Sequence, residues 1–188
     1  KIYKKMKTKI FITGSSGFIG FHVAKKFLDK GFKVCGFDSM NNYYDVNLKK
    51  SRLKILRKFK NFSFIRGNIE NEKVLNISMN KFKPSFIIHL AAQAGVRYSI
   101  KNPKVYLNSN INGTFNVIEA AKKFKVKHLI IGSSSSVYGA NKKFPFQEID
   151  KADNQLSFYA ATKKSTEIIA HSYSSLWNIP ITMLRFFT

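Results

Sequence analysis

The sequence predicts an α/β protein, a Rossmann-type, doubly wound parallel sheet with helices on both faces. Three observations predict this fold class. Short, almost continuously apolar runs alternate with amphipathic stretches along the chain, which is typical of parallel strands that are buried on both faces and joined by helices. A glycine-rich stretch, "GSSGFIG", directly follows the first apolar run. The second apolar run ends on an acidic residue, Asp38, as in units that bind dinucleotides.

Each element follows from one of two patterns: strands are expected at apolar runs, and helices where apolar residues recur with helical spacing. The run 9–13 predicts the first strand. The stretch 18–30 predicts a helix that stops at Gly31, a residue that favours helix termination. The remaining elements, in chain order, are strand 32–38, helix 44–60, strand 62–67, helix 70–82, strand 85–92, helix 103–124, strand 127–135, helix 157–177 and strand 180–187.

The chain length, 188 residues, is that of one domain, or of one domain and part of another. We expect residues 1–8 to form a basic N-terminal extension and residues 9–188 to form a dinucleotide-binding domain. Met6 opens the stretch "MKTKIFITG", which is typical of a natural start, and the chain ends just after the last predicted strand. Both features predict a fragment of a longer protein.

The charge balance is strongly basic, with 33 Lys and Arg against 10 Asp and Glu and a net charge of +23. Such a charge is typical of proteins that bind nucleic acid or anionic lipid. Here the basic residues are dispersed, largely as pairs on predicted helices such as Lys25–Lys26 and Lys122–Lys123, and no RNA-binding aromatic motif, helix-turn-helix or zinc spacing occurs. We therefore interpret the charge as composition bias and expect no specific nucleic-acid partner.

Compartment and metal content are predicted from what the sequence lacks. No apolar run reaches the ~18 residues that a membrane span needs, and the first residues do not resemble a signal peptide. Cys35 is the one cysteine and excludes an internal disulfide, so a cytoplasmic protein without a membrane partner is expected. No metal site is expected, because no metal-ligand spacing relates the histidines. Packing or surface roles are predicted for His22, His89, His128 and His171.

The glycine-rich stretch predicts a phosphate-binding loop. Gly14, Gly17 and Gly20 lie between the first strand and the first helix, where glycines permit a tight turn and close approach to a pyrophosphate, and where the helix N-terminus supplies amide hydrogens. Asp38 would accept hydrogen bonds from the adenosine ribose and repel a 2′-phosphate. The sequence therefore predicts NAD in preference to NADP. A simple turn residue is the alternative for Asp38.

Hydroxyl groups and a tyrosine–lysine pair are predicted at the same edge of the sheet. Serines 133–136 end the fifth strand, and ligands of such sheets bind at the carboxyl ends of the strands. In "YAATK", Tyr159 and Lys163 lie one helical turn apart. We expect Lys163 to lower the pKa of the Tyr159 phenol, so that the tyrosine takes a hydroxyl proton while hydride leaves the same carbon for NAD. The alternatives are a turn and a solvated helix face.

Together these motifs resemble the extended short-chain dehydrogenases/reductases of the nucleotide-sugar epimerase and dehydratase group. The resemblance covers residues 10–188 and is carried by "GSSGFIG", "HLAAQAGVRYS", "SSSSVYG" and "YAATK". Within this group, the sequence is most similar to the UDP-glucuronate 4-epimerase subgroup of bacterial capsule loci. The segments that carry this similarity are "FDSMNNYYDVNLKKSRL", "SSSSVYGANKKFPF" and "YAATKKSTEIIAHSYSSLW". The resemblance implies NAD, a UDP-sugar substrate, a homodimer and a small C-terminal substrate domain that is missing from this chain.

The resemblance also implies roles for individual residues. Tyr159 matches the catalytic base, Lys163 its partner, and Ser134 the catalytic hydroxyl. Ser134 and Ser136 match hydroxyls that contact the substrate. Arg97, in "GVRYS", is the candidate for binding the substrate carboxylate or phosphate, and a loop arginine in a very basic chain is the alternative. Asn68 departs from the more usual Asp, so its adenine contact is expected to be altered. The cofactor contacts are expected at Gly14, Gly17, Phe18, Ile19, Gly20, Asp38, Asn68, Ile69, Leu90, Ala91, Ala92, Asn110, Tyr159 and Lys163.

The implied function is epimerisation at C4 of a UDP-hexuronate, from UDP-glucuronate to UDP-galacturonate, through a 4-keto intermediate for cell-surface polysaccharide precursors. Related dehydratases carry an Asp-Glu pair where Ser135 and Ser136 stand, and related decarboxylases carry Glu in place of Ser136, so neither chemistry is expected here. UDP-glucose/UDP-galactose 4-epimerase or another nucleotide-sugar epimerase stays open. A non-enzymatic alternative is an NAD-sensing or RNA-binding module. Without the substrate domain, an inactive fragment is also compatible with the sequence.

Overall fold

The computed structural model describes residues 8–187, and one six-stranded sheet forms their centre. The strand order is β3-β2-β1-β4-β5-β6, and each neighbouring pair runs parallel. The order reverses between β1 and β4, so the predicted doubly wound fold is confirmed. The strands are β1 (Lys9–Thr13), β2 (Lys33–Asp38), β3 (Phe62–Arg66), β4 (Phe86–His89), β5 (His128–Ser134) and β6 (Ile181–Phe186).

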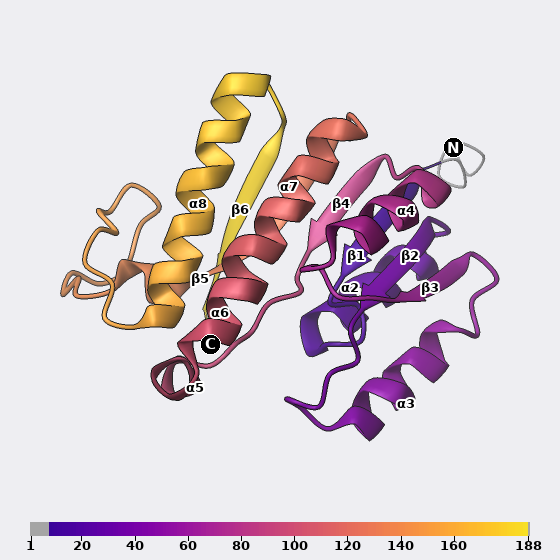
Figure 1. The fold of residues 1–188 in the computed structure, drawn as a ribbon, viewed down its shortest axis with the longest axis horizontal. Helices are drawn as coiled ribbons and strands as arrows, with labels where there is room; N and C mark the ends of the chain where they lie inside the picture. Colours follow the sequence, from indigo (N-terminus) through magenta and orange to yellow (C-terminus); the bar gives the residue numbers. More distant parts are fainter. Residues whose placement is uncertain (1–7, 188) are drawn as a thin grey trace.

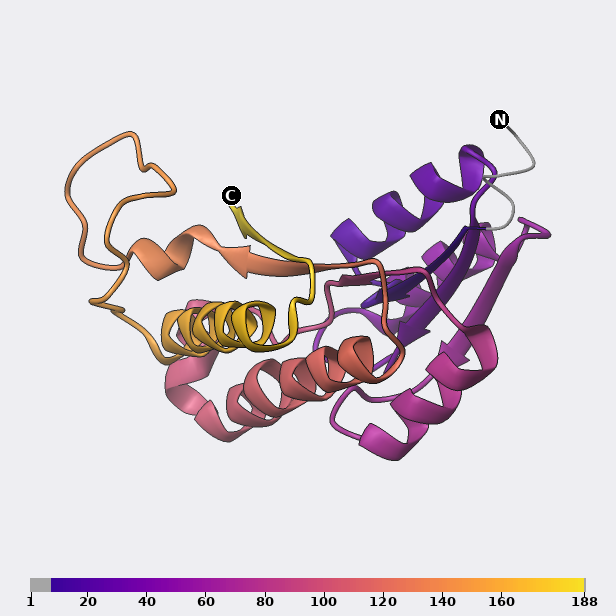
Figure 2. The same cartoon turned by 90° about the horizontal axis from the view of Figure 1, so that it is seen from above.

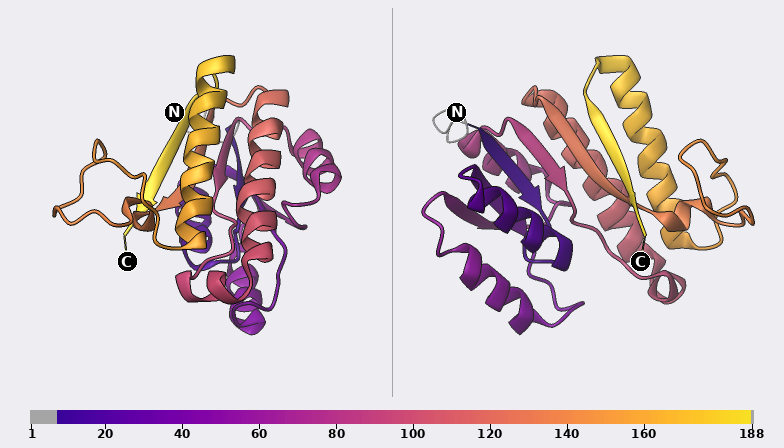
Figure 3. Two further views of the ribbon diagram at one scale, coloured as in Figure 1. Left: turned by 60° about the vertical axis from the view of Figure 1, so that its left-hand side comes forward. Right: turned by 180° about the vertical axis from the view of Figure 1, so that it is seen from behind.

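Helices cover both faces of the sheet. They are α2 (Phe18–Asp29), α3 (Val46–Leu56), α4 (Glu72–Phe82), α5 (Val96–Lys101), α6 (Pro103–Tyr106), α7 (Gly113–Lys123) and α8 (Phe158–Trp177). Helices α4, α7 and α8 lie on one face (Figure 1), and α2 lies on the other (Figure 2). Seen from behind, α2 and α3 lie on the side of β1–β3 (Figure 3, right), and within residues 8–187 no helix covers β5 and β6 from that side.

Alternating strand residues build two apolar layers, one on each side of the sheet. Phe11 and Ile87 are fully buried and pack in the layer that also holds Met79 of α4. Ile12 of β1 points the other way and packs in the layer with Leu28 of α2. The two layers hold the sheet between its helices. Because all six strands run parallel, their carboxyl ends lie at one edge of the sheet.

The predicted helix 103–124 is wrong as a single helix. The structure breaks it into α6, a π-helical turn at Leu107–Asn112 and α7, and it adds the unpredicted α5 before them. The side chain of Asn110, within the π turn, accepts from the backbone N–H of Gln93 (2.8 Å) and donates to its carbonyl (3.1 Å). A π turn widens the helix by one residue, which lets this amide point inward.

Three expectations from the sequence concern the N-terminal extension, a membrane span and a metal site. Residues 1–7 lie outside the described part of the chain, so the N-terminal extension 1–8 stays a prediction. Within residues 8–187, no helix combines the length and apolar character that crossing a membrane requires. The same range contains no group of three or more His, Cys, Asp and Glu side chains that could hold a metal ion.

Candidate active site

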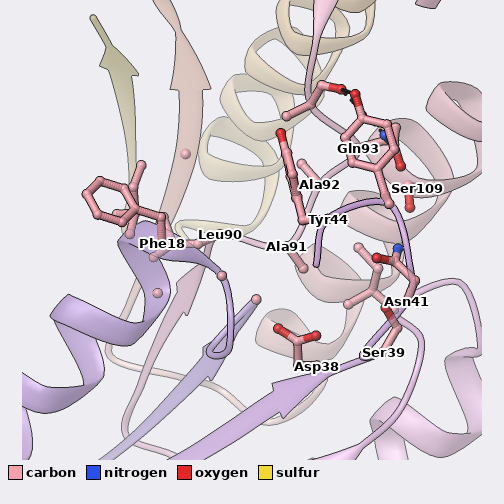
Figure 4. A pocket seen from close by; sticks show the side chains of 18 of the residues that line it. Phe18, Asp38, Ser39, Asn41, Tyr44, Leu90, Ala91, Ala92, Gln93 and Ser109 are labelled. Carbon is pink, nitrogen blue, oxygen red and sulfur yellow. Dashed lines mark hydrogen bonds between the residues drawn. The ribbon is translucent and has the colours of Figure 1, made fainter. Parts of the chain in front are cut away.

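A cavity of about 600 Å³ lies at the carboxyl ends of the strands, at the point where the strand order reverses. Open α/β sheets bind ligands at this position. Asp38, Asn41 and Tyr44 lie around it with Phe18 and Leu90 (Figure 4). The cavity continues to Tyr159 and Lys163 of α8, so the glycine-rich loop and the "YAATK" motif border one continuous space.

The glycine-rich loop leaves no room for side chains where the sheet and the cavity meet. Gly14 has φ +70°, and a Cβ on it would lie 2.7 Å from the backbone nitrogen of Ala91. A Cβ on Gly20 would overlap the carbonyl oxygen of Gly14. Gly17 precedes α2 and makes no side-chain cap, so the first amide N–H groups of this helix are open to a ligand. This cradle suits the pyrophosphate of a dinucleotide.

Asp38 combines the two roles that the sequence left open. Its carboxylate is buried and accepts from the backbone N–H of Ser16 (Oδ2, 2.9 Å) and of Met40 (Oδ1, 2.9 Å). Asp38 therefore shapes the turn. Each carboxylate oxygen keeps a further acceptor site, and the residue lines the cavity, so it can also accept from ribose hydroxyls.

Two cations lie in the same half of the cavity as Asp38. The Lys49 ammonium is buried and donates to the backbone oxygen (2.9 Å) and the side-chain Oδ1 (2.7 Å) of Asn41. Burial lowers the pKa of Lys49, and the charge of Asp38 opposes this effect. Arg52 donates from Nη1 to the carbonyl of Ser16 (3.4 Å). The loop after β2 is therefore held to α3 by the groups that line the cavity.

Tyr159 is fixed at the other end of the cavity from several directions. Its backbone N–H donates to Ser99 Oγ (3.2 Å), and its carbonyl accepts from Thr162 Oγ1 (2.7 Å). Its ring packs edge-on against Tyr106, with centroids 6.1 Å apart. Ser134 Oγ, at the end of β5, donates to Ser136 Oγ (3.1 Å). The hydroxyl groups and the phenol come from β5 and α8, as the sequence predicted.

The predicted direction of the Tyr159 pKa is wrong for this structure. Burial raises the pKa of Tyr159, and a hydrogen bond with Ser134 only partly opposes the rise. Lys163 is buried too, and burial lowers its pKa to about 8, with the charge of Glu167 opposing. The Lys163 ammonium donates to the carbonyl of Gly132 (2.7 Å). Helical spacing correctly predicted that both side chains line the cavity, but burial decides the direction of both pKa shifts.

Most of the predicted cofactor residues line the cavity. Those that do are Gly14, Gly17, Phe18, Ile19, Gly20, Asp38, Asn68, Ile69, Leu90, Ala91, Ala92, Tyr159 and Lys163. Asn110 is not among the lining residues, because its buried amide bonds Gln93 and Thr162. Ser134 and Ser136 are not among the lining residues, whereas Ser133, which precedes Ser134 in β5, is. Arg97 is exposed on α5 and does not line the cavity.

Several lining residues were not predicted as site residues. They are Phe37, Ser39, Asn41, Tyr43, Tyr44, Asp45, Leu48, Lys49, Arg52, Gly67, Gln93, Ala94, Ser109, Gly132, Ser133 and Phe186. One usable signal was present, since Lys49 and Arg52 are spaced to share a helix face. Tyr43 lines the cavity, and its hydroxyl also donates to the carbonyl of Ala94 (2.9 Å).

The histidines take the packing and surface roles that the sequence predicted. His89 is buried between Thr13 Oγ1 (2.7 Å) and Thr114 Oγ1 (2.9 Å), and burial lowers its pKa to about 3. Thr13 Oγ1 also accepts from the backbone N–H groups of Leu90 and Ala91. With both acceptor sites used, Thr13 donates to Nδ1, so neutral His89 carries its proton on Nε2. These hydrogen bonds hold the backbone of Leu90 and Ala91, which lies against Gly14 of the glycine-rich loop.

Comparison with known proteins establishes the family. Residues 11–188 match the family model described as GDP-mannose 4,6 dehydratase. The chain belongs to this family. The match confirms the resemblance to the extended short-chain dehydrogenases/reductases that the motifs predicted.

Individual relatives carry more specific names. The chain is 51% identical over 180 residues to a probable UDP-glucuronate 4-epimerase of Rhizobium meliloti, covering 96% of the chain and 53% of the relative. It is 52% identical over 180 residues to the CapI protein of Staphylococcus aureus, covering 96% and 54%. The structure of a UDP-glucuronic acid 4-epimerase from Bacillus cereus, with UDP-glucuronic acid and NAD, has a TM-score of 0.89 at 36% identity, covering 96% and 57%. The chain spans about half the length of the curated relatives it matches.

Proposed function

We propose that this chain is the NAD-binding part of a nucleotide-sugar 4-epimerase that acts on a UDP-hexuronate and interconverts UDP-glucuronate and UDP-galacturonate. The observation that carries the proposal is the meeting of Tyr159, Lys163 and the Ser133–Ser134 end of β5 at one end of a dinucleotide-sized cavity. The names of the curated relatives support the substrate class.

The cavity has the parts that NAD requires. The open N-terminus of α2 and the glycine loop would hold the pyrophosphate, and Asp38 would hold the adenosine ribose. Lys163 reaches the far end of the cavity, where its ammonium would contact the second ribose. When bound there, NAD supplies the two-electron acceptor that oxidises C4 of the sugar and later returns the same electrons.

The protein's own part in the chemistry is proton transfer. The Tyr159 oxygen takes the proton of the C4 hydroxyl as the carbon is oxidised to a ketone, and gives it back when the keto-sugar is reduced on its other face. For this step the raised pKa of Tyr159 has to be lowered. We propose that the positive charge of Lys163, one helical turn away, lowers it. Ser134 would donate to the C4 oxygen. No net redox change results.

The side chains beside Ser134 narrow the reaction class. Ser135 and Ser136 carry hydroxyls where an elimination would need a carboxylic acid, so we propose epimerisation and not dehydration, although the family is named after a dehydratase. Arg97 is exposed on α5; we keep it as the proposed reader of the substrate carboxylate or phosphate. We propose that Asn110 holds the backbone of Gln93 at the cavity rim and does not contact NAD.

The assembly and setting of the protein are also proposals. Helices α7 and α8 lie side by side (Figure 1) and leave Phe115 and Ile168 exposed, so we propose that this face forms a homodimer. The CapI relative supports a role in capsule precursor synthesis, and we propose a cytoplasmic setting for that role. Sedimentation velocity of the wild type and of a Phe115→Lys variant tests the dimer; a wild type that stays monomeric at micromolar concentration contradicts it.

The experiment for the proposed function uses the full-length protein without added reductant. We expect it to convert UDP-glucuronate to UDP-galacturonate, with both sugars resolved by chromatography. Conversion of UDP-glucose to UDP-galactose alone would keep the enzyme class but contradict the uronate. Absence of turnover on every UDP-sugar, with NAD bound, would instead favour the NAD-sensing alternative.

A further inference from the structure

Helix α8 presents a third functional group to the sheet, one turn after Lys163. The Glu167 carboxylate accepts from Ser133 Oγ at Oε1 (2.6 Å) and from both Nε (3.0 Å) and Nη2 (2.9 Å) of Arg185. The side chains of Arg185 and Glu167 are 19% and 10% exposed, so this ion pair is largely shielded from water. Burial by itself would raise the pKa of Glu167, but these bonds outweigh it and lower the pKa.

The contacts of Lys163 and Glu167 fall on adjacent residues of β5. Lys163 donates to the carbonyl of Gly132, and Glu167 accepts from the hydroxyl of Ser133. The next residue along the strand is Ser134, whose hydroxyl also bonds the phenol of Tyr159. Two successive turns of α8 therefore hold two successive residues of β5. The register between the helix and the strand decides where the Ser134 hydroxyl meets the phenol.

Arg185 secures this arrangement from the neighbouring strand. It stands on β6 directly opposite Ser133 in the parallel register. Its guanidinium also lies 4.7 Å from the ring centroid of Tyr138, in the short 3₁₀ turn that follows Ser134. The carboxylate of Glu167 thus joins α8, β5 and β6 at the edge of the sheet where the cavity opens.

We propose that Glu167 is a positioning residue for the epimerisation: its carboxylate, held by Arg185, fixes the Ser133–Ser134 end of β5 against α8 and supplies the negative charge that balances Lys163. The inference rests on the proposed function. Glu167 does not line the cavity, so it acts through Ser133 and Lys163 and not on a substrate.

The groups around Lys163 show which charge acts on its pKa. Glu167 is the carboxylate whose charge raises the pKa of Lys163 against the effect of burial. From β4, His89 faces Lys163 and is neutral, with a pKa lowered to about 3 by burial and by the Lys163 charge. Tyr159 faces it from α8 itself, and β5 offers the carbonyl of Gly132. Removing the charge of Glu167 therefore moves the Lys163 pKa down from about 8.

The test compares Glu167→Gln and Ser133→Ala with Asp29→Asn in the full-length protein. Asp29 forms an exposed ion pair with Lys25 on α2, so its variant removes a carboxylate charge without touching β5 or α8. We measure kcat, KM, bound NAD and the melting temperature. In the absence of any sugar, NMR of ¹³C-labelled lysine follows the titration of Lys163, whose signal is assigned by its loss in Lys163→Arg.

We expect Glu167→Gln to lower kcat by about 10- to 100-fold, the loss typical of small misplacements of reacting groups, with KM and bound NAD unchanged and Lys163 titrating at lower pH. Ser133→Ala should lower kcat by a smaller factor and leave the Lys163 titration unchanged, because the charge stays. Asp29→Asn should match the wild type in kcat and in the titration. A melting temperature that falls while kcat per folded molecule stays at the wild-type value would overturn the proposal.

Two further outcomes are decisive. If Glu167→Gln does not fold, Ser133→Ala decides the matter, since it removes one hydroxyl and keeps the ion pair; an unchanged kcat in that variant overturns the positioning role. If the wild type turns over no UDP-sugar, the proposed function fails, and the Lys163 titration still tests this inference on its own. An unchanged titration in Glu167→Gln would then refute the link between the two residues.

Discussion

Replacing Asp38 by Asn tests the cofactor site through two buried hydrogen bonds. The carboxylate accepts from the backbone N–H of Ser16 and of Met40, one on each oxygen. An asparagine has a single acceptor oxygen, so its NH₂ group must face one of these donors. Leaving a buried donor unpaired costs about 1–3 kcal/mol, so we expect Asp38→Asn to be measurably less stable than the wild type.

The same substitution changes cofactor choice. Hydrogen bonds to a charged acceptor are worth about 1 kcal/mol more than those to a neutral one, so NAD affinity should fall by roughly fivefold. The repulsion of a 2′-phosphate disappears, while Lys49 and Arg52 still line the cavity. We expect the wild type to prefer NAD over NADP by at least about tenfold, or about 1.4 kcal/mol. In Asp38→Asn the ratio of NAD affinity to NADP affinity should approach one.

Isothermal titration calorimetry with NAD and NADP measures both effects. Asp29→Asn is the matched control, because it removes the same charge from an exposed ion pair with Lys25 on α2, and its cofactor preference should equal that of the wild type. A wild type that binds NAD and NADP equally well, or an Asp38→Asn variant that keeps the full preference, would refute the role of Asp38 as the ribose acceptor.

Three other predictions follow from the same site. Gly20→Ala places a Cβ against the carbonyl of Gly14, so calorimetry should show NAD affinity reduced by at least about tenfold; wild-type affinity would contradict the loop geometry. Burial lowers the pKa of Lys163 from 10.5 to about 8, so the ammonium is lost above that pH and kcat/KM should fall there. In the unfolded chain the lysine keeps its proton up to a pKa of 10.5, so between about pH 8 and 10.5 the contribution of Lys163 to the free energy of unfolding should rise with pH. A kcat/KM profile that stays flat to pH 10 would count against the role of Lys163. In filter binding, RNA retained at low salt should be released at about 0.2 M salt, and a salt-resistant, sequence-preferring complex would overturn the interpretation of the charge.

The fold was predictable because its signals are local. Each of the six strands lies inside the range that its apolar run predicted, and the glycine loop and Asp38 indicated the strand-order reversal. The π turn at Leu107–Asn112 was not predictable in the same way. It depends on the Asn110 amide bonding the backbone of Gln93, and the apolar periodicity of the segment carries no trace of that contact.

The site was predictable where residues end strands or repeat with helical spacing. Asp38, Ser133 at the end of β5 and the pair Tyr159 and Lys163 line one cavity. Lys49 was missed because it reaches the cavity from a helix side, by way of the loop at Asn41. The direction of the Tyr159 pKa was mistaken because spacing reports proximity, whereas the pKa depends mainly on burial, which only the packed structure shows.

The most direct test of the central claim removes one oxygen atom from Tyr159. In Tyr159→Phe of the full-length protein, interconversion of UDP-glucuronate and UDP-galacturonate should fall by about 10²–10⁴-fold or more, with NAD content and melting temperature unchanged. Tyr173→Phe is the control on the same helix, since its hydroxyl bonds Glu119 away from the cavity, and it should keep wild-type turnover. Near-normal turnover in Tyr159→Phe would contradict the assignment of this tyrosine as the base, and with it the proposed mechanism.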